Sequence, residues 1–335
     1  MGAPTTAIVA PRRSVRRGAG ILLRYREASI LIVAVVLMSY FAISSSTFLT
    51  ERNLIVISHI LAPIAIIAAG QVLLLVSGEI DLSVGHVYAL APFLMHELVF
   101  YYGVPAVPAI LLAVGAGTCI GAINGLITVK IGVPSFVTTL GMLNLLHGLT
   151  LMISNAFPAR VPEATRGLQP WLGGYPWSIM IWALGIVLVI QFLFSQTRWG
   201  LHTIAAGGNP LGAAEAGVPV HRVKIGNFMI TSTLGAFTGI MSGFRIDSIE
   251  PLAGGTTIMF AAVAAAVIGG TALAGGSGTV LGAAIGALVL AVLRNGFTLI
   301  GINADRFFLV LGIAILIAMV LNVYLARART SGRLR

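Results

Sequence analysis

Side chains that can form hydrogen bonds without carrying a charge recur inside the apolar stretches of this sequence. Six positions could contact or flank a passing solute: Gln71, Asn124, Phe136, Thr139, Asn144 and Asn295. The amides among them both donate and accept hydrogen bonds while remaining neutral. Weak hydrogen bonds at several sites favour passage, because one tight site would impede release. We therefore expect these residues to line or flank a central, mostly uncharged path for a neutral polyhydroxyl solute.

Ionisable side chains are much rarer within the same stretches. His147 and Arg294 are the candidates for an ion-coupling site, and neither has an obvious carboxylate partner in the interior. Charged groups near the centre of a bilayer are costly and often mark ion or proton pathways. Because such groups are scarce here, an ion-coupled secondary transporter of a small polar solute is the alternative interpretation and not the first one.

Motifs for catalysis, nucleotide hydrolysis and metal binding are missing from the sequence. Both lysines, Lys130 and Lys224, precede an isoleucine, which excludes a phosphate-binding loop ending in Gly-Lys-Ser or Gly-Lys-Thr. The six histidines are scattered without the spacing of metal ligands. No Gly-x-Ser-x-Gly turn is present for a nucleophilic serine. We expect no catalytic residues, no metal and no cofactor.

The composition of the chain is that of a protein embedded in a membrane. Of 335 residues, 58% are hydrophobic and 9% are charged, and the mean hydropathy is +1.00. Soluble domains carry about 25% charged residues, so a fold of this size could not cover its surface in water. Apolar runs of about 20 residues, the length that crosses a bilayer, recur along the chain. The sequence predicts an all-α, polytopic membrane protein.

Ten apolar runs are the predicted transmembrane helices. They cover residues 28–43, 54–77, 82–102, 106–129, 133–153, 177–194, 224–244, 257–274, 277–301 and 305–325. We expect one membrane domain over residues 28–325, with residues 195–223 as its longest internal loop and with tails at 1–27 and 326–335. An uncleaved first helix, in place of a signal peptide, gives the even number of helices that leaves both tails on one side.

Basic residues predict the orientation of these helices. If both tails are cytoplasmic, the internal segments hold Arg12, Arg13, Arg16, Arg17, Arg24, Arg26, Lys130, Arg198, Arg222, Lys224, Arg327, Arg329, Arg333 and Arg335. The external segments then hold Arg52, Arg160, Arg166, Arg245 and Arg306. This internal excess predicts cytoplasmic N- and C-termini. The net charge of +10 is spread over tails and loops, so we expect membrane lipid and not nucleic acid around the chain.

A glycine-rich pattern occurs twice. Residues 115–125 and residues 276–286 both read G-x-G-T-x-x-G-A-x-x-G. The copies lie in the fourth and the ninth predicted spans, an odd number of spans apart, so they cross the bilayer in opposite directions. The pattern predicts an inverted-topology repeat, an arrangement common among transporters.

Two polar segments between apolar runs are candidate functional elements. In residues 77–85, Asp81 could cap the following helix by accepting backbone N–H groups at its positive end. In residues 208–217, Asn209 is a suitable N-cap, Pro210 a suitable first helical residue and Gly217 a suitable stop. The resulting cytoplasmic helix is too short to be stable alone, so docking on a partner would stabilise it. Its contact residues are expected to be Gly208, Asn209, Ala213, Ala214, Glu215 and Gly217.

These segments together resemble the membrane permeases of ribose/xylose-type sugar importers, which are binding-protein-dependent ATP-binding-cassette transporters. Residues 78–85 are similar to the family's G-G-I-D-L-S-V-G signature. Glu79 replaces its second glycine, and the matching positions include Gly78, Asp81, Ser83 and Gly85. Residues 133–141 resemble its P-x-F-[IV]-x-T-L-G segment, and 200–224 resemble its cytoplasmic coupling loop. Residues 268–279 and 295–296 resemble its C-terminal half.

The resemblance implies a function and a set of partners. The chain would form the translocation path for a sugar or related polyol that a periplasmic binding protein delivers. It would pair with a second copy of itself or with a similar permease. Hydrolysis of ATP would occur in separate ATP-binding subunits, whose closure would switch the permease between outward- and inward-facing states.

Overall fold

The computed structural model describes residues 26–302 and, beyond them, residues 306, 309–310, 312–313, 316 and 320. Within these residues the chain is almost entirely helical, which confirms the predicted all-α fold. The α-helices are α2 (Arg26–Ser44), α3 (Glu51–Val76), α4 (Val84–Phe100), α5 (Ala106–Leu126), α6 (Ser135–Ser154), α7 (Ser178–Gln196), α8 (Arg198–Gly208), α9 (Pro210–Glu215), α10 (Val220–Ile246), α11 (Gly255–Ile268) and α12 (Val280–Leu299).

Short elements complete this part of the chain. A π-helical turn, η1 (Ile127–Ile131), extends α5, while η2 (Glu163–Thr165) and η3 (Pro170–Gly174) lie between α6 and α7. The strands β1 (Ala159–Arg160) and β2 (Ser248–Ile249) form one antiparallel ladder.

Five of the described helices are long and apolar enough to cross a membrane. These are Glu51–Val76, Ala106–Ile131, Ser135–Ser154, Ser178–Gln196 and Val280–Leu299. Three shorter apolar helices cover Ser29–Ser44, Val84–Phe100 and Gly255–Ile268. The tenth predicted span, 305–325, and the two predicted tails lie largely outside the described residues, so the number of ten spans remains a prediction.

The predicted span at 257–274 is too long. Helix α11 has 14 residues and ends at Ile268, because the chain turns at Gly270, whose φ of 89° is left-handed. At 1.5 Å per residue α11 extends about 21 Å, less than the roughly 30 Å of a hydrocarbon core. Residues 271–274 are as apolar as the helix before them, so hydropathy alone could not locate this end.

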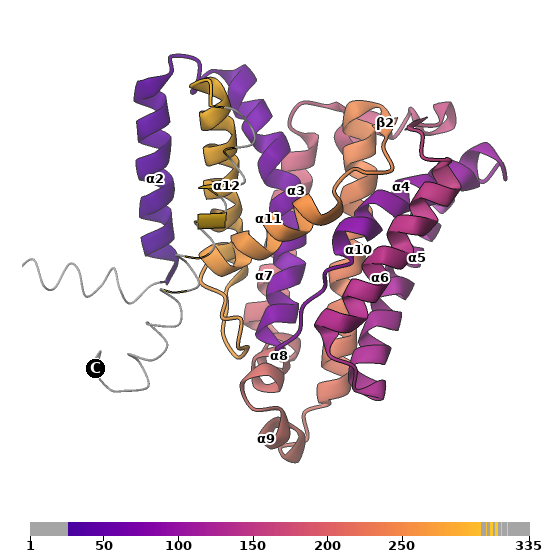
Figure 1. Cartoon of the computed structure of the whole chain (residues 1–335), viewed down its shortest axis with the longest axis vertical. Coiled ribbons are helices and arrows are strands. Elements are labelled where there is room, and N and C mark those ends of the chain that lie inside the picture. The colour runs from indigo at the N-terminus through magenta and orange to yellow at the C-terminus, as the bar shows by residue number, and fades with distance from the viewer. Residues whose placement is uncertain are drawn as a thin grey trace, which may run out of the picture.

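The helices form a bundle in which α3 is central. Nearly all of α3 beyond its first turns is buried, and it packs against α7, α10, α11 and α12. Figure 1 shows α2 at one edge, α4 to α6 at the other, and α11 running obliquely between them. Residues 77–83 return along the bundle from the end of α3 before α4 begins, while α8 and α9 occupy the end opposite β2 (Figure 1).

The order of the helices supports an inverted repeat. A long, a short and a long helix follow one another in α3–α4–α5 and again in α10–α11–α12. Helix α10 packs on α4 and α5, while α3 packs on α11 and α12, which is the exchange of partners that a pseudo-two-fold axis produces. The two glycine motifs, however, are not equivalent: Gly125 lies against Ile225 of α10, whereas the corresponding Gly286 lies against the Ala265 carbonyl of α11.

Candidate solute cavity and coupling segment

The segment that leads into α4 is organised around the carboxylate of Asp81. Asp81 is fully buried, and its Oδ1 accepts hydrogen bonds from the backbone N–H of Ser83 at 2.7 Å and from the Ser83 hydroxyl at 2.6 Å. Oδ2 accepts a third from the hydroxyl of Ser232, at 3.2 Å. The N-cap position of α4 is Ser83, and the Asp81 carboxylate accepts hydrogen bonds from the backbone N–H groups of Ser83 and of Val84, the first residue of the helix. Asp81 therefore bonds to backbone N–H groups at the positive end of α4, as the sequence predicts.

Two of the amides expected along the path hold this segment in place. Gln71 donates from Nε2 to the Asp81 carbonyl at 2.6 Å, and Asn124 donates from Nδ2 to the Ser83 hydroxyl at 2.9 Å. Both side chains are fully buried. A buried amide that is bonded to backbone and hydroxyl partners stabilises the packing of its helices. The structure therefore gives Gln71 and Asn124 a role in positioning residues 77–85.

Glu79, which departs from the signature motif, has a specific partner. Its Oε1 lies 2.6 Å from Nζ of Lys224 near the start of α10, and the two side chains are 13% and 15% exposed. Among the described residues Glu79 does not have a positive φ, whereas its neighbour Gly78 does, at 81°. The backbone at position 79 thus accepts a side chain without strain, and the added charge is neutralised by Lys224.

The other residues expected along the path are dispersed. Asn295 exchanges two amide hydrogen bonds with Asn53 of α3, at 2.8 and 3.0 Å, and the Thr139 hydroxyl bonds within α6. Both are buried, whereas Phe136 is 56% exposed and Asn144 is also exposed. The structure does not bring the six residues together, and a role for all six in solute passage stays a prediction.

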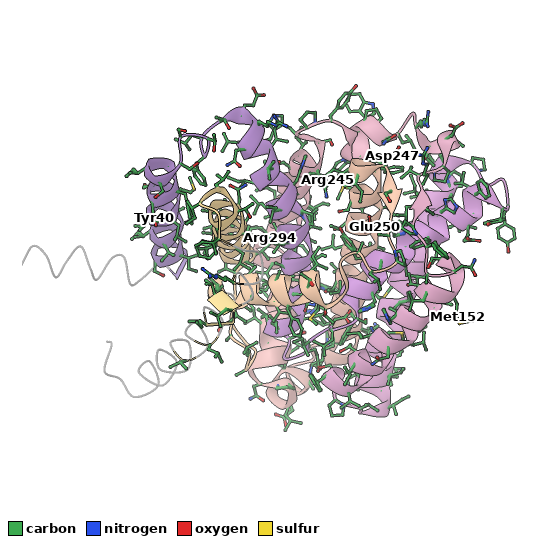
Figure 2. All side chains as sticks on the ribbon, turned by 45° about the horizontal axis from the view of Figure 1, so that its top comes forward. Tyr40, Met152, Arg245, Asp247, Glu250 and Arg294 are labelled. Atoms are coloured by element: carbon green, nitrogen blue, oxygen red, sulfur yellow. The ribbon has the colours of Figure 1, made fainter. Side chains whose placement is uncertain are left out.

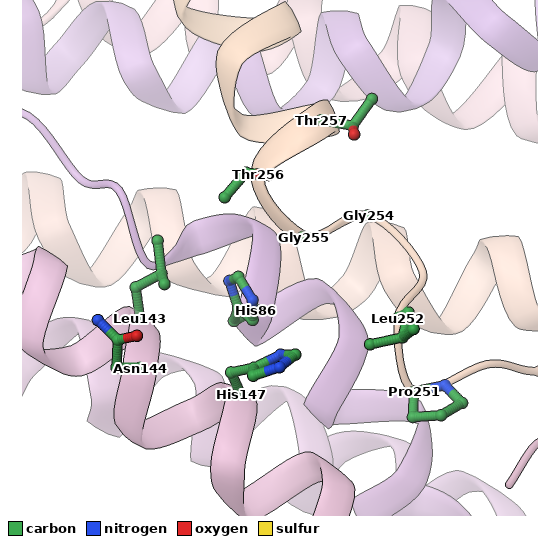
Figure 3. Close-up of a pocket in the computed structure, with 10 residues that line it drawn as sticks. All are labelled: His86, Leu143, Asn144, His147, Pro251, Leu252, Gly254, Gly255, Thr256 and Thr257. Carbon is green, nitrogen blue, oxygen red and sulfur yellow. The ribbon is translucent and has the colours of Figure 1, made fainter. Parts of the chain in front are cut away.

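A cavity of about 320 Å³ opens where α4 and α11 begin. Its walls come from α4, from α6 and from the residues that lead into α11, as Figure 3 shows. The lining residues are His86, Leu143, Asn144, His147, Pro251, Leu252, Gly254, Gly255, Thr256 and Thr257. Asn144 is the only one of the six expected path residues among them.

Close contact between two helix starts shapes this cavity. A Cβ atom at Gly85 would overlap the carbonyl oxygen of Gly255, so α4 and α11 can touch at their N-terminal ends only because residue 85 is glycine. This contact gives one signature glycine a physical role. Beside it, the rings of His86 and His147 meet edge to face with centroids 5.2 Å apart.

Within the described part of the chain, the lining is polar and carries no permanently charged side chain. It offers two imidazoles, one amide and two hydroxyl groups. Sequence reasoning missed His86, Thr256 and Thr257, and it considered His147 only for ion coupling. Hydropathy did not indicate this site, because the predicted spans at 82–102 and 257–274 are both long enough to cross a bilayer and do not look like short helices.

The loop between α7 and α10 contains the short helix that the sequence predicts. The Asn209 side chain accepts a hydrogen bond from the backbone N–H of Gly212 at 3.0 Å, and Pro210 begins α9. After α9, Gly217 adopts a φ of 82°, and the N–H of Val218 reaches the Ala213 carbonyl at 2.9 Å. This ending satisfies carbonyl groups that the helix leaves open.

Most of α9 is exposed. Of the residues expected to contact a partner, Ala213 is buried, whereas Gly208, Asn209, Ala214, Glu215 and Gly217 are exposed. Leu211, which the sequence analysis did not single out, is 79% exposed.

Helix α8 joins α9 firmly to the rest of the bundle. A Cβ atom at Gly207 would overlap the carbonyl oxygen of Val76 at the end of α3, and the same carbonyl accepts a hydrogen bond from the Gly276 N–H at 2.8 Å. Trp199 of α8 donates from Nε1 to Asn227 of α10 at 2.9 Å. The end of α8, next to the start of α9, therefore meets the end of α3 directly before the Asp81 segment.

Long apolar helices, together with two short helices that begin beside a polar cavity, are typical of a multi-pass membrane permease. The chain belongs to the family described as branched-chain amino acid transport system / permease component, whose model matches residues 53–320. The chain is thus a permease component of the inner membrane and not an enzyme.

Individual relatives match nearly the whole chain. A xylose/arabinose import permease protein of Sulfolobus acidocaldarius is 39% identical, over 92% of this chain and 87% of its own length. A ribose import permease protein of Escherichia coli K12 is 35% identical, over 88% of this chain and 93% of its own. A fructose import permease protein of Rhizobium meliloti is 27% identical, over 89% and 85%. No solved structure matches the chain.

Proposed function

We propose that this chain is the membrane subunit of an ATP-driven importer and forms the translocation path for a neutral sugar or related polyol. The observation that carries the proposal is the likeness, over nearly the full length of both chains, to permeases named for xylose/arabinose and ribose import. A further relative from Escherichia coli K12, 34% identical, is named a probable ABC transporter permease protein, and this name favours ATP-driven uptake over an ion-coupled secondary transporter.

The chemistry of the cavity supports a sugar over an amino acid. A zwitterionic amino acid needs a negative group for its ammonium and a positive group or a set of N–H donors for its carboxylate. Among the residues that the structure describes, the lining contains no Asp, Glu, Lys or Arg. Amide, hydroxyl and imidazole groups match instead the hydroxyl groups of a sugar, which both donate and accept hydrogen bonds.

Helix α9 is the proposed contact with a separate ATP-binding subunit, in which ATP hydrolysis takes place. A leucine that is 79% exposed at the tip of a polar loop is poorly placed in water and is suited to an apolar groove. Ala214 and Ala216 allow close approach, and Glu215 offers one charged contact. In this arrangement α9 and both chain termini are cytoplasmic, and a periplasmic sugar-binding protein docks at the opposite end, near β2.

A second permease, either a copy of this chain or a similar one, completes the proposed importer. Expression of the chain together with a candidate ATP-binding subunit and a candidate sugar-binding protein from the same genome tests the composition. We expect a complex with two permease chains, whose ATPase activity rises with the loaded binding protein. We also expect the melting temperature of the binding protein to rise with xylose, arabinose, ribose or fructose. A rise with leucine and none with any sugar would contradict the proposal.

A further inference from the structure

The cavity at the start of α4 and α11 combines features that the proposed function does not yet use. Two short helices, Val84–Phe100 and Gly255–Ile268, begin beside one another within the bundle. In the first turn of α11, Thr256 and Thr257 line the cavity, and the N–H groups of a first turn have no acceptor within their own helix. Helix starts of this kind also carry a partial positive charge. Both properties suit oxygen atoms of a ligand.

His86 adds an independent sign of a ligand. The residue is 6% exposed, and within the described residues its Nδ1 is buried without a hydrogen-bond partner. A buried polar atom without a partner costs about 1–3 kcal/mol, so natural proteins usually supply a partner from the protein, water or a ligand. Figure 3 shows the His86 ring between Gly255 and His147, at the centre of the lining residues.

We propose that this cavity is a sugar-contact site within the permease, in which His86, Asn144, His147, Thr256 and Thr257 exchange hydrogen bonds with the hydroxyl groups of a sugar in transit. The inference rests on the proposed function, because it requires that a sugar passes through this chain. It adds a binding step inside the membrane subunit, so that part of the substrate specificity lies here and not only in the binding protein.

The neutral lining defines the class of ligand. Imidazole, amide and hydroxyl groups each offer a donor, an acceptor or both, and none requires a charged partner. A phosphorylated sugar would lack a lysine or arginine, and an amino acid would lack a carboxylate for its ammonium. Several weak hydrogen bonds also permit release, which a transport site requires.

Protection of introduced cysteines tests the site directly. The native cysteine, Cys119, is exposed, so it is first replaced by serine. Asn144→Cys and Thr257→Cys then place a thiol in the cavity, and Met152→Cys places one on α6 at a position that is 77% exposed and outside the lining. Each variant is assembled into the complete importer in proteoliposomes and treated with a small polar methanethiosulfonate reagent, with xylose, leucine or no solute.

We expect xylose to slow the modification of the Asn144→Cys and Thr257→Cys variants about fivefold, at a concentration of about four times the half-saturating value for uptake. Leucine should have no effect, and modification of the Met152→Cys control should not change. Equal rates with xylose and leucine would overturn the inference. Sugar uptake by the unmodified importer is measured in parallel. If uptake is normal but xylose does not protect the introduced cysteines, only the proposed site is contradicted. If there is no sugar uptake, the proposed function is contradicted too.

Variants of the lining test the same site through transport. His86→Ala should reduce the uptake rate about tenfold, because the variant loses its hydrogen bonds to the sugar. A tenfold change corresponds to about 1.4 kcal/mol, which is within the range of a net hydrogen bond. His86→Gln, which keeps a donor and an acceptor, should retain most of the uptake. Asn144→Ala should also reduce uptake, and its exposed side chain bonds only to Leu140 of its own helix, so folding is preserved. Uptake at the normal rate in both alanine variants would overturn the proposal.

Discussion

The ion pair between Glu79 and Lys224 joins the segment before α4 to the start of α10. Both side chains are mostly buried, so the loss of either partner leaves a charge in a poor environment. We expect Glu79→Gln to destabilise the chain by on the order of 2 kcal/mol, because a hydrogen bond to a charged group is lost. Thermal unfolding in detergent should then shift down by about 3 °C.

Exchanging the two charges distinguishes the loss of the ion pair between residues 79 and 224 from any other effect of changing residue 79. The double variant with Glu79→Lys and Lys224→Glu should recover much of the stability, whereas each single change should not. Glu215→Gln, at an exposed position on α9, is the matched control and should leave the unfolding temperature unchanged. Independent, additive losses in the double variant would show that the two residues do not act as a pair.

At the scale of the element, α9 depends on its left-handed ending. Gly217 has a φ of 82° and open space around its Cα, so Gly217→Val acts through backbone strain of about 1–2 kcal/mol and not through a clash. If α9 docks on the ATP-binding subunit, Gly217→Val should abolish sugar uptake while membrane insertion and docking of the binding protein persist. Ala214→Trp should have the same effect by blocking close approach.

A second glycine provides the control for this prediction. Gly103, in the turn between α4 and α5, also has a positive φ, 64°, and no neighbour within 4 Å. Gly103→Val therefore imposes the same kind of strain at a turn far from α9, and it should preserve uptake. Normal uptake and normal stimulated ATPase activity in the Gly217→Val and Ala214→Trp variants would exclude α9 as the coupling element.

Helices and caps could be predicted from local sequence, but the cavity could not. Asn209, Pro210 and Gly217 define α9 because capping depends on residues a few positions apart. By contrast, His86 and His147 are brought together by the packing of α4 against α6, and neither has a sequence neighbour that indicates the other. The amides Gln71, Asn124 and Asn295 were expected along the path, but each forms hydrogen bonds that fix helices. In the sequence, an amide that contacts a solute and an amide that bonds one helix to another look the same, because both are single polar residues in an apolar run.

For the whole molecule, the orientation in the membrane is the next prediction. With Cys119→Ser as background, Leu211→Cys on α9 and Trp171→Cys in the segment between α6 and α7 place exposed thiols near opposite ends of the bundle. In intact cells an impermeant thiol reagent should modify the Trp171→Cys variant, and it should reach the Leu211→Cys variant only after lysis. The opposite pattern would invert the topology predicted from the basic residues.

Charged residues near β2 are consistent with an aqueous surface at that end. Figure 2 shows Arg245, Asp247 and Glu250 together close to the end of α10, and Gln169 bonds to Asp247 at 3.3 Å. Exposed aromatic residues, Trp171 and Tyr175, lie in the neighbouring segment. Charges with flanking aromatics are typical of a membrane interface, and a binding protein that delivers sugar would dock on such a surface.

The most direct test of the whole account is the energy source of sugar uptake. Proteoliposomes containing this permease with its ATP-binding subunit are supplied with binding protein and labelled xylose or ribose outside and ATP inside, with and without a protonophore. We predict uptake that requires internal ATP and the binding protein and that persists when the protonophore removes the proton gradient. Uptake that proceeds without ATP and stops when a proton or sodium gradient is removed would contradict the assignment as an ATP-driven importer permease.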